Sequence, residues 1–186
     1  MAILIDLLDD DTRPKAPRIE GVTEAQRWHG KRLAQIHEIH LHQMAYVRHV
    51  MEQIEAGATS AEALGEAIGD LQMRDNYRAF GNLCGQECQM LTFHHTAEDE
   101  YIFPALMQGS EGLRKVVERL GAEHNIIHQL LEEFESRSAS LIGDPSPETF
   151  ALVKDVFDTL QKVVASHFGY EQTELEEALG YMNVPL

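Results

Sequence analysis

Apolar side chains recur at spacings of three and four residues along most of this sequence. Between residues 24 and 57 the stripe consists of Leu33, Ile36, His40, Met44, Val47, Met51 and Ile54. This spacing keeps side chains on one face of an α-helix, and no segment shows the period of two that marks a strand. We therefore expect an all-α fold.

Three further segments repeat this spacing. Their stripes are Tyr77, Phe80, Cys84, Cys88, Leu91, Glu98 and Ile102, then Val116, Leu120, His124, Ile127, Leu131 and Phe134, then Val156, Leu160, Val163, His167, Glu171 and Leu175. Helix starts are indicated by capping boxes at Thr23–Gln26 and Thr59–Glu62, by Ser110, and by Ser146 before Pro147. Four long amphipathic helices with short connections predict an antiparallel four-helix bundle.

A chain of 186 residues fits one domain. Residues 1–22 contain two prolines and no sustained period, so we interpret them as an N-terminal tail that docks on the body. Residues 23–186 would form the bundle. Within it, Pro104 should kink the third segment or end it early, because proline removes a helical hydrogen bond.

The net charge of −16 argues against nucleic acid and against an anionic membrane surface as partners. The first eleven residues hold a short apolar run with no basic residue before it and several acids after it. This is a poor signal peptide and too short to span a bilayer. We expect a cytoplasmic protein.

The only cysteines, Cys84 and Cys88, are four residues apart. A four-thiolate zinc site would need a second pair, which the chain lacks. We expect both to pack as small apolar groups, with a redox role as the alternative.

The stretch HHTAEDEYIFPAL, residues 94–106, has a counterpart in HFGYEQTELEEAL, residues 167–179. Both contain His-x-x-x-Glu, namely His94 with Glu98 and His167 with Glu171. A spacing of four places both side chains of a pair on one helix face, so both can reach one metal cluster. Burying these glutamates without a cation would cost several kcal/mol each.

The other two helices also carry inward histidines. EHNIIH contains His124 and His128 at a spacing of four, and IHEIHLH contains His37 and His40 near the inward face and His42 off it. Five histidines, two bridging glutamates and a bridging oxygen would fill eleven of the twelve positions of two six-coordinate metals. The open position is where a small ligand such as O₂ would bind.

Mixed imidazole and carboxylate ligands without thiolate suit iron, manganese or zinc, and two bridging carboxylates in a bundle favour a di-iron centre. Ferritin-type bundles use Glu-x-x-His, yet no histidine here has a glutamate three residues before it. Glu123, Asp99 and Glu174 can each accept from the second nitrogen of a ligand histidine, although we expect them in solvent. The histidines expected at the surface or behind the ligands are His29, His42 and His49.

Taken together, IHEIH, HHTAEDEYIFP, EHNIIH and SHFGYE resemble the hemerythrin-like (HHE) family over residues 24–180. The resemblance implies a four-helix bundle with two iron ions joined by an oxo or hydroxo bridge. It also implies binding of O₂, or related chemistry with peroxide or nitric oxide. By the same resemblance, one iron would be held by His124, His128 and His167. His37 and His94 would hold the iron with the free position, and Glu98 and Glu171 would bridge.

The sequence departs from the oxygen carriers of that family in three places. The fourth helix has His-x-x-x-Glu where the carriers have His-x-x-x-x-Asp. His95 follows His94, at a position that some members use as an extra ligand, and His40 competes with His37. A ligand from His40, His95 or one of the tyrosines would fill the open position and favour slower redox chemistry or sensing. The tyrosines considered are Tyr46, Tyr77, Tyr101 and Tyr170.

Two functional classes remain. One is a protein that binds or senses O₂ or a related small ligand. The other is a di-iron enzyme that decomposes hydrogen peroxide or handles nitric oxide. An enzyme needs groups that move protons beside the open position, and the sequence assigns no catalytic residue. We therefore place ligand binding first.

Overall fold

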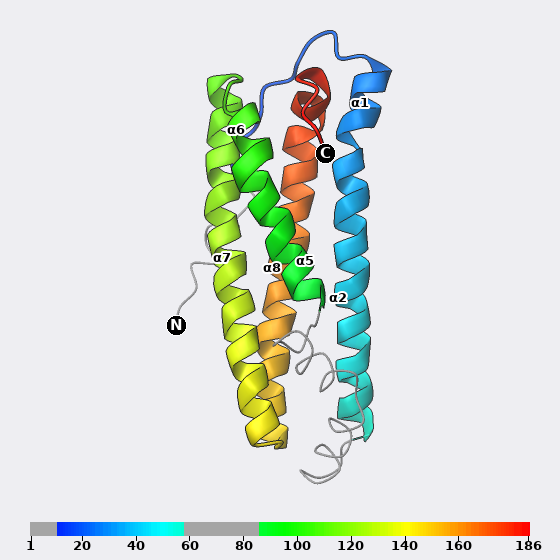
Figure 1. Cartoon of the computed structure of the whole chain (residues 1–186), viewed down its shortest axis with the longest axis vertical. Helices are drawn as coiled ribbons and strands as arrows, with labels where there is room; N and C mark the ends of the chain where they lie inside the picture. The colour runs from blue at the N-terminus through cyan, green and yellow to red at the C-terminus, as the bar shows by residue number, and fades with distance from the viewer. Residues whose placement is uncertain (1–10, 58–85) are drawn as a thin grey trace. The chain divides into compact units, whose positions relative to one another are not determined.

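The computed structural model of the chain describes residues 11–57 and 86–186 (Figure 1). The elements in these ranges are α1 (Glu24–Gly30), α2 (Arg32–Gly57), α5 (Gln86–Ala97), the π-helix η2 (Glu98–Ile102), α6 (Phe103–Leu106), α7 (Glu111–Gly143) and α8 (Pro147–Tyr181). No strand occurs in the described ranges, so the prediction of an all-α fold is confirmed. The predicted capping box at Thr59–Glu62 and the stripe positions Tyr77, Phe80 and Cys84 lie outside them.

The predicted helix starts are confirmed by their hydrogen bonds. At α1, the hydroxyl of Thr23 accepts from the backbone N–H of Gln26, whose side chain accepts in turn from the N–H of Thr23. Ser110 caps α7 and Ser146 caps α8, each through a hydroxyl that accepts a backbone N–H three residues later. Pro147 occupies the first position of α8, where a missing N–H costs nothing.

The helix around Pro104 continues through a π-turn. Since Pro104 has no N–H, the regular ladder must be interrupted one turn earlier. In η2, the N–H of Phe103 donates to the carbonyl of Glu98, five residues back instead of four. The predicted kink or early end is therefore replaced by a local widening of the helix, and such π-turns are frequent at functional sites.

The chain forms two compact units. Unit 1 contains Met1–Ile39, Phe93–Ile127 and Val163–Leu186, and unit 2 contains His40–Thr92 and His128–Lys162. None of the described helices combines the length and apolar character that crossing a membrane requires.

The core of unit 1 joins four helical segments. Its fully buried side chains include Leu33 of α2, Leu106 of α6, Leu120 of α7 and Leu179 of α8. Consecutive segments run in opposite directions: the start of α7 packs against α6 and the end of α8 in this unit (Figure 1). Unit 1 is therefore an antiparallel helical bundle with apolar side chains at its centre.

Two glycines let α1 and α8 touch backbone to backbone inside unit 1. A Cβ atom on Gly30 would lie 2.0 Å from the carbonyl oxygen of Glu176. A Cβ atom on Gly180 would lie 2.0 Å from the carbonyl oxygen of Gln26. No other residue fits at either position, because a side chain would overlap a backbone atom that cannot move away.

Unit 2 has its own apolar core. Met44 and Met51 of α2, Phe134 of α7 and Phe157 of α8 are buried there, and the two phenylalanine rings lie 5.4 Å apart. At its surface, Arg48 donates to Asp158 at 2.8 Å and to Gln161 at 2.5 Å. His40 is also buried in this unit.

Cys88 differs from the sequence-based expectation. The residue is half-buried and disulfide-bonded, so it does not pack as a free apolar thiol. The chain contains one other cysteine, Cys84, which lies outside the described residues. A sulfur atom in a disulfide is held by a covalent bond with fixed geometry and does not pack as a separate thiol, so the expectation for Cys88 was wrong.

Candidate metal centre

Histidines and glutamates from four helices converge in unit 1. They form two groups, and within each group the possible ligand atoms all lie within 4.8 Å of one another. One group consists of His95, His124 and His167, and the other of His37, His94, Glu98 and Glu171. All are buried except His94, which is partly exposed.

Each of the two glutamates faces both groups. The Oε1 atom of Glu98 lies 3.2 Å from Nε2 of His94, and its Oε2 atom lies 3.5 Å from Nε2 of His124. The Oε2 atom of Glu171 lies 3.4 Å from Nε2 of His37 and 3.8 Å from Nε2 of His167. A carboxylate placed between two clusters of nitrogen atoms has the position of a ligand that joins two ions.

The carboxylate oxygens of Glu98 and Glu171 have no hydrogen-bond donor among the described residues, and both side chains are fully buried. Burial, with repulsion from Glu171, raises the pKa of Glu98 well above its usual range. Burial raises the pKa of Glu171 to about 8. Buried oxygens without donors are costly, and cations would satisfy them. The donor set therefore fits metal ions.

The rings of His124 and His167 give independent support for this fit. Nδ1 of His124 lies 2.9 Å from Asp99, and Nδ1 of His167 lies 3.1 Å from Glu123. An ionised carboxylate only accepts hydrogen bonds, so each ring donates its Nδ1 proton away from the centre, and its Nε2 atom faces inward. Those two Nε2 atoms lie 3.1 Å apart. Two imidazole nitrogen atoms that face each other at this distance could bind one cation.

On the other side of the centre, His37 is fixed by packing and by an amide. Its ring stacks on Phe168 with centroids 3.8 Å apart, and its Nδ1 atom lies 2.9 Å from the side-chain amide of Gln172. Its Nε2 atom lies 3.0 Å from Nε2 of His94. The atom of Gln172 at this distance is the amide nitrogen, so Nδ1 of His37 accepts the hydrogen bond. Binding of a metal at Nε2 would require the amide to turn its oxygen toward Nδ1.

A family model for the hemerythrin HHE cation binding domain matches residues 31–179, which include every one of these histidines and glutamates. The chain belongs to this family. No curated protein and no solved structure gives a significant match. The HHE resemblance of the sequence is thereby confirmed, and with it a cation-binding domain whose His and Glu side chains can hold metal.

The groups behind the HHE ligands were only partly anticipated. Glu123 is fully buried, and Glu174 is 9 % exposed, so the expectation that they lie in solvent was wrong. Burial raises the pKa of Glu123, but hydrogen bonds from His167 and from Arg13 outweigh this effect and lower it. Asp99, in contrast, keeps 41 % of its side chain exposed while it accepts from His124. The sequence around an acidic residue does not show whether its side chain will be buried, as in Glu123, or partly exposed, as in Asp99.

His128 and His40 belong to unit 2. His128 follows His124 by four residues on α7, yet the group that contains His124 is completed by His95. His95 was noted in the sequence only as an extra ligand, because two adjacent helical positions normally point about 100° apart. The role of His128 as a ligand stays a prediction.

The other histidines and tyrosines considered have various environments where the structure describes them. His29 contacts the backbone oxygen of Val184 at 2.6 Å, and His42 and His49 are exposed. Tyr101 is 71 % exposed, whereas the buried Tyr170 donates its hydroxyl to the carbonyl of Pro14. The other tyrosines considered are Tyr46, which is exposed, and Tyr77, which lies outside the described residues.

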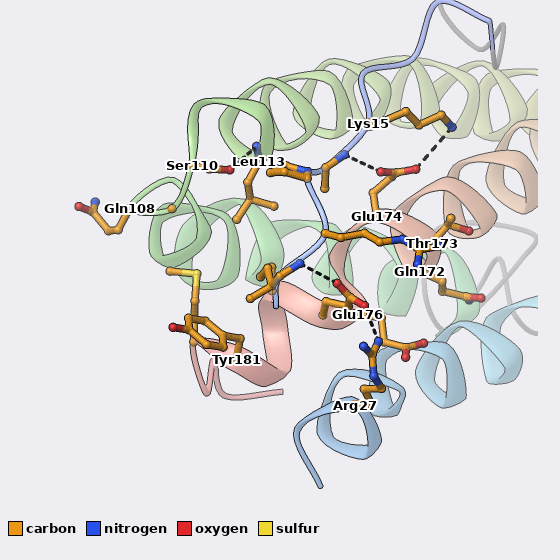
Figure 2. A pocket seen from close by; sticks show the side chains of 18 residues that line it. Lys15, Arg27, Gln108, Ser110, Leu113, Gln172, Thr173, Glu174, Glu176 and Tyr181 are labelled. Atoms are coloured by element: carbon orange, nitrogen blue, oxygen red, sulfur yellow. Dashed lines mark hydrogen bonds and ion pairs between the residues drawn. The ribbon is translucent and has the colours of Figure 1, made fainter. Parts of the chain in front are cut away.

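A cavity of about 1100 Å³ lies within unit 1 of the HHE domain (Figure 2). The N-terminal segment at Lys15–Ile19 lines one side, and α8 lines another with Gln172 and Glu176. Because Gln172 also contacts His37, one wall of this cavity is the residue that holds a candidate ligand.

Proposed function

We propose that this domain holds two metal ions, one beside each histidine group, joined by Glu98 and Glu171. The observation that supports this proposal is the position of the two carboxylates, each of which faces nitrogen atoms of both groups at 3.2–3.8 Å. A single ion would leave one group of buried nitrogen atoms without a cation. We propose His95 as a ligand together with His37, His94, Glu98, His124, His167 and Glu171, and we keep His128 as the alternative to His95.

We further propose that both ions are iron. The candidate ligands are imidazoles and carboxylates without a thiolate, a set that suits iron, manganese or zinc, and paired carboxylates in a helical bundle favour two irons. When bound, an iron pair would supply a redox couple and a coordination position for O₂ or a related small ligand such as peroxide or nitric oxide. The net charge of −16 disfavours nucleic acid as a partner.

The residues of this chain would position the ions and restrict access to them. Asp99 and Glu123 keep the Nδ1 protons of His124 and His167 away from the centre. Phe168 and Phe103 stack on His37 and His124, so apolar surface closes both sides and excludes water. A site without water would slow irreversible oxidation of the iron ions, which suits reversible binding of a small ligand in the cytoplasm.

Elemental analysis with visible spectroscopy tests this function. We expect about two irons per chain, with charge-transfer bands that bleach on reduction without oxygen and return reversibly when O₂ is admitted and removed. His167→Asn should lose the bands, and the exposed-histidine control His42→Asn should keep them.

Two results would overturn the proposal. One zinc or no metal in the freshly purified protein would exclude an iron pair. Irreversible oxidation by O₂ together with catalytic consumption of hydrogen peroxide or nitric oxide would instead support the enzyme alternative.

A further inference from the structure

One cation of the N-terminal segment reaches the layer behind the histidines. Arg13 is 4 % exposed, and its guanidinium binds Glu123 through two parallel hydrogen bonds, Nε to Oε1 at 2.9 Å and Nη2 to Oε2 at 2.8 Å. The same Oε2 atom accepts from Nδ1 of His167 at 3.1 Å. The chain of contacts therefore runs from Arg13 through Glu123 to His167.

Arg13 also contacts the helix turn that carries His167. Its Nη1 atom donates to the hydroxyl of Ser166 at 3.0 Å and to the backbone oxygen of Ser166 at 3.4 Å. Its guanidinium carbon lies 4.7 Å from the ring centroid of Tyr170, a cation–π distance. These contacts use the planar fork of arginine, which lysine cannot reproduce.

Several independent contacts hold the segment that carries Arg13. The backbone N–H of Ala16 donates to Glu174 at 2.6 Å, and the N–H of Ile19 donates to Glu177 at 3.0 Å. Arg119 donates to the backbone oxygen of Thr12 at 3.0 Å. The segment precedes residue 31, where the family match begins. Its contact with the centre is thus a feature of this chain outside the matched domain.

The carboxylate partners of His124 and His167 differ in burial and in their contacts with Arg13. The partner of His124 is Asp99, which is 41 % exposed and can exchange its hydrogen bonds with water. The partner of His167 is Glu123, which is fully buried. Apart from the contact with His167, the two carboxylate oxygens of Glu123 accept hydrogen bonds from Arg13. Removing one member of a buried ion pair leaves an uncompensated charge, so the orientation of Glu123 depends on Arg13.

We propose that Arg13 is a positioning residue for the metal centre: it orients Glu123 so that Glu123 holds the proton of His167 on Nδ1 and leaves Nε2 for a metal ion. This inference rests on the proposed function insofar as it concerns metal. Docking of the N-terminal segment therefore controls the affinity for a metal ion of the histidine group that contains His167. Without Arg13, Glu123 would rotate away from His167, and the His167 ring would populate the tautomer with its proton on Nε2.

The test combines metal binding with a measurement on the metal-free protein. Full-length wild type, Arg13→Gln, Arg13→Lys and the control Arg119→Gln are titrated with Co²⁺ against a chelator. Arg119→Gln removes a contact to the same segment without touching Glu123. We expect Arg13→Gln to weaken Co²⁺ binding about 10- to 100-fold, Arg13→Lys to weaken it less, and Arg119→Gln to change it less than about threefold.

The tautomer of His167 is read in the metal-free proteins by ¹⁵N NMR, with His167→Asn for assignment. We expect the Nδ1–H form in wild type and Arg119→Gln, and a shift toward Nε2–H in Arg13→Gln. An unchanged tautomer in folded Arg13→Gln, or in Arg13→Lys if the first variant does not fold, would overturn the inference. So would equal losses of Co²⁺ affinity in Arg13→Gln and Arg119→Gln. A wild type that binds no metal would instead contradict the proposed function, while the tautomer would still report on Arg13.

Discussion

The Nε2 atoms of His124 and His167 lie 3.1 Å apart, while the Nδ1 atom of each ring is held by a carboxylate. Burial lowers the pKa of His167 to about 4, so this ring is neutral near neutral pH. The carboxylates of Glu98 and Glu171 beside these rings are buried without a hydrogen-bond donor among the described residues. The packing of unit 1 therefore favours metal binding at the expense of the stability of the metal-free protein.

Replacing a bridging candidate should separate these two effects. In Glu171→Gln, the amide cannot carry the negative charge that two cations need, so we expect metal affinity to fall at least about tenfold. The metal-free variant should be more stable than wild type at alkaline pH, because only one buried carboxylate, that of Glu98, must then ionise. Chelator competition and urea denaturation check the two effects. The exposed Glu118→Gln on α7 is the control, and equal metal affinity in both variants would contradict a bridging role.

The metal-free protein should lose stability as the pH rises from about 6.5 to about 8. The folded-state pKa of Glu171 is raised to about 8 by burial, and that of Glu98 is also raised, so the folded chain retains protons that the unfolded chain has released. Stability from such groups is present at low pH and is lost through the folded-state pKa, by about 1.4 kcal/mol per pH unit for each proton. His167, with its pKa lowered to about 4, acts in the opposite direction only below about 6.5.

Urea denaturation across this pH range measures the slope. The double variant Glu98→Gln/Glu171→Gln should have a flat profile between the same limits. The metal-loaded wild type should show the reverse trend, since protons compete with metal for the same carboxylates and imidazoles. A metal-free wild type that becomes more stable toward pH 8 would show that the glutamates are not buried as described.

Substitution of His95 and His128 should decide which of them is a ligand. We expect His95→Ala to lower metal affinity by about tenfold or more, because His95 lies in the group with His124 and His167. His128 is in neither of the two groups, so we expect a smaller loss for His128→Ala. Isothermal titration with Co²⁺ measures both variants. A loss confined to His128→Ala would restore the ligand set inferred from sequence.

Alanine at the glycine contacts should weaken unit 1. Gly30→Ala and Gly180→Ala each place a Cβ atom 2.0 Å from a backbone carbonyl oxygen of the facing helix. We expect a loss of about 1–3 kcal/mol or more in the free energy of unfolding. The control is Gly169→Ala on α8, which has open space and should gain about 0.5–1 kcal/mol from higher helix propensity. Thermal unfolding distinguishes these outcomes, and equal stability of all three variants would refute the close helix contact.

Much of the site follows from helical periodicity alone. The pairs His94 with Glu98 and His167 with Glu171 lie on one face because their spacing is close to one helical turn. Their convergence in unit 1 follows once the helices form a bundle with that face inward. The π-turn at η2 was not foreseen in this form, since Pro104 shows where the ladder is interrupted but not how the chain accommodates the interruption.

Contacts behind the ligands could not be read in the same way. Arg13 precedes Glu123 by 110 residues and lies in a segment without a regular period, so no spacing rule connects them. The choice between His95 and His128 as the partner of His124 is likewise a matter of helix rotation. An adjacent position can turn inward where a helix is locally widened, and the sequence does not reveal that rotation.

The all-α fold, the helix starts at Thr23, Ser110 and Ser146, and the HHE family were accessible from the sequence, because these depend on local spacing and on residue chemistry. The tertiary structure alone decided that His95 joins His124 and His167 in one group, and that Arg13 binds Glu123 behind His167. Both relationships join side chains that are far apart in sequence. They depend on the close packing of separate segments, which fixes distances that no local pattern encodes.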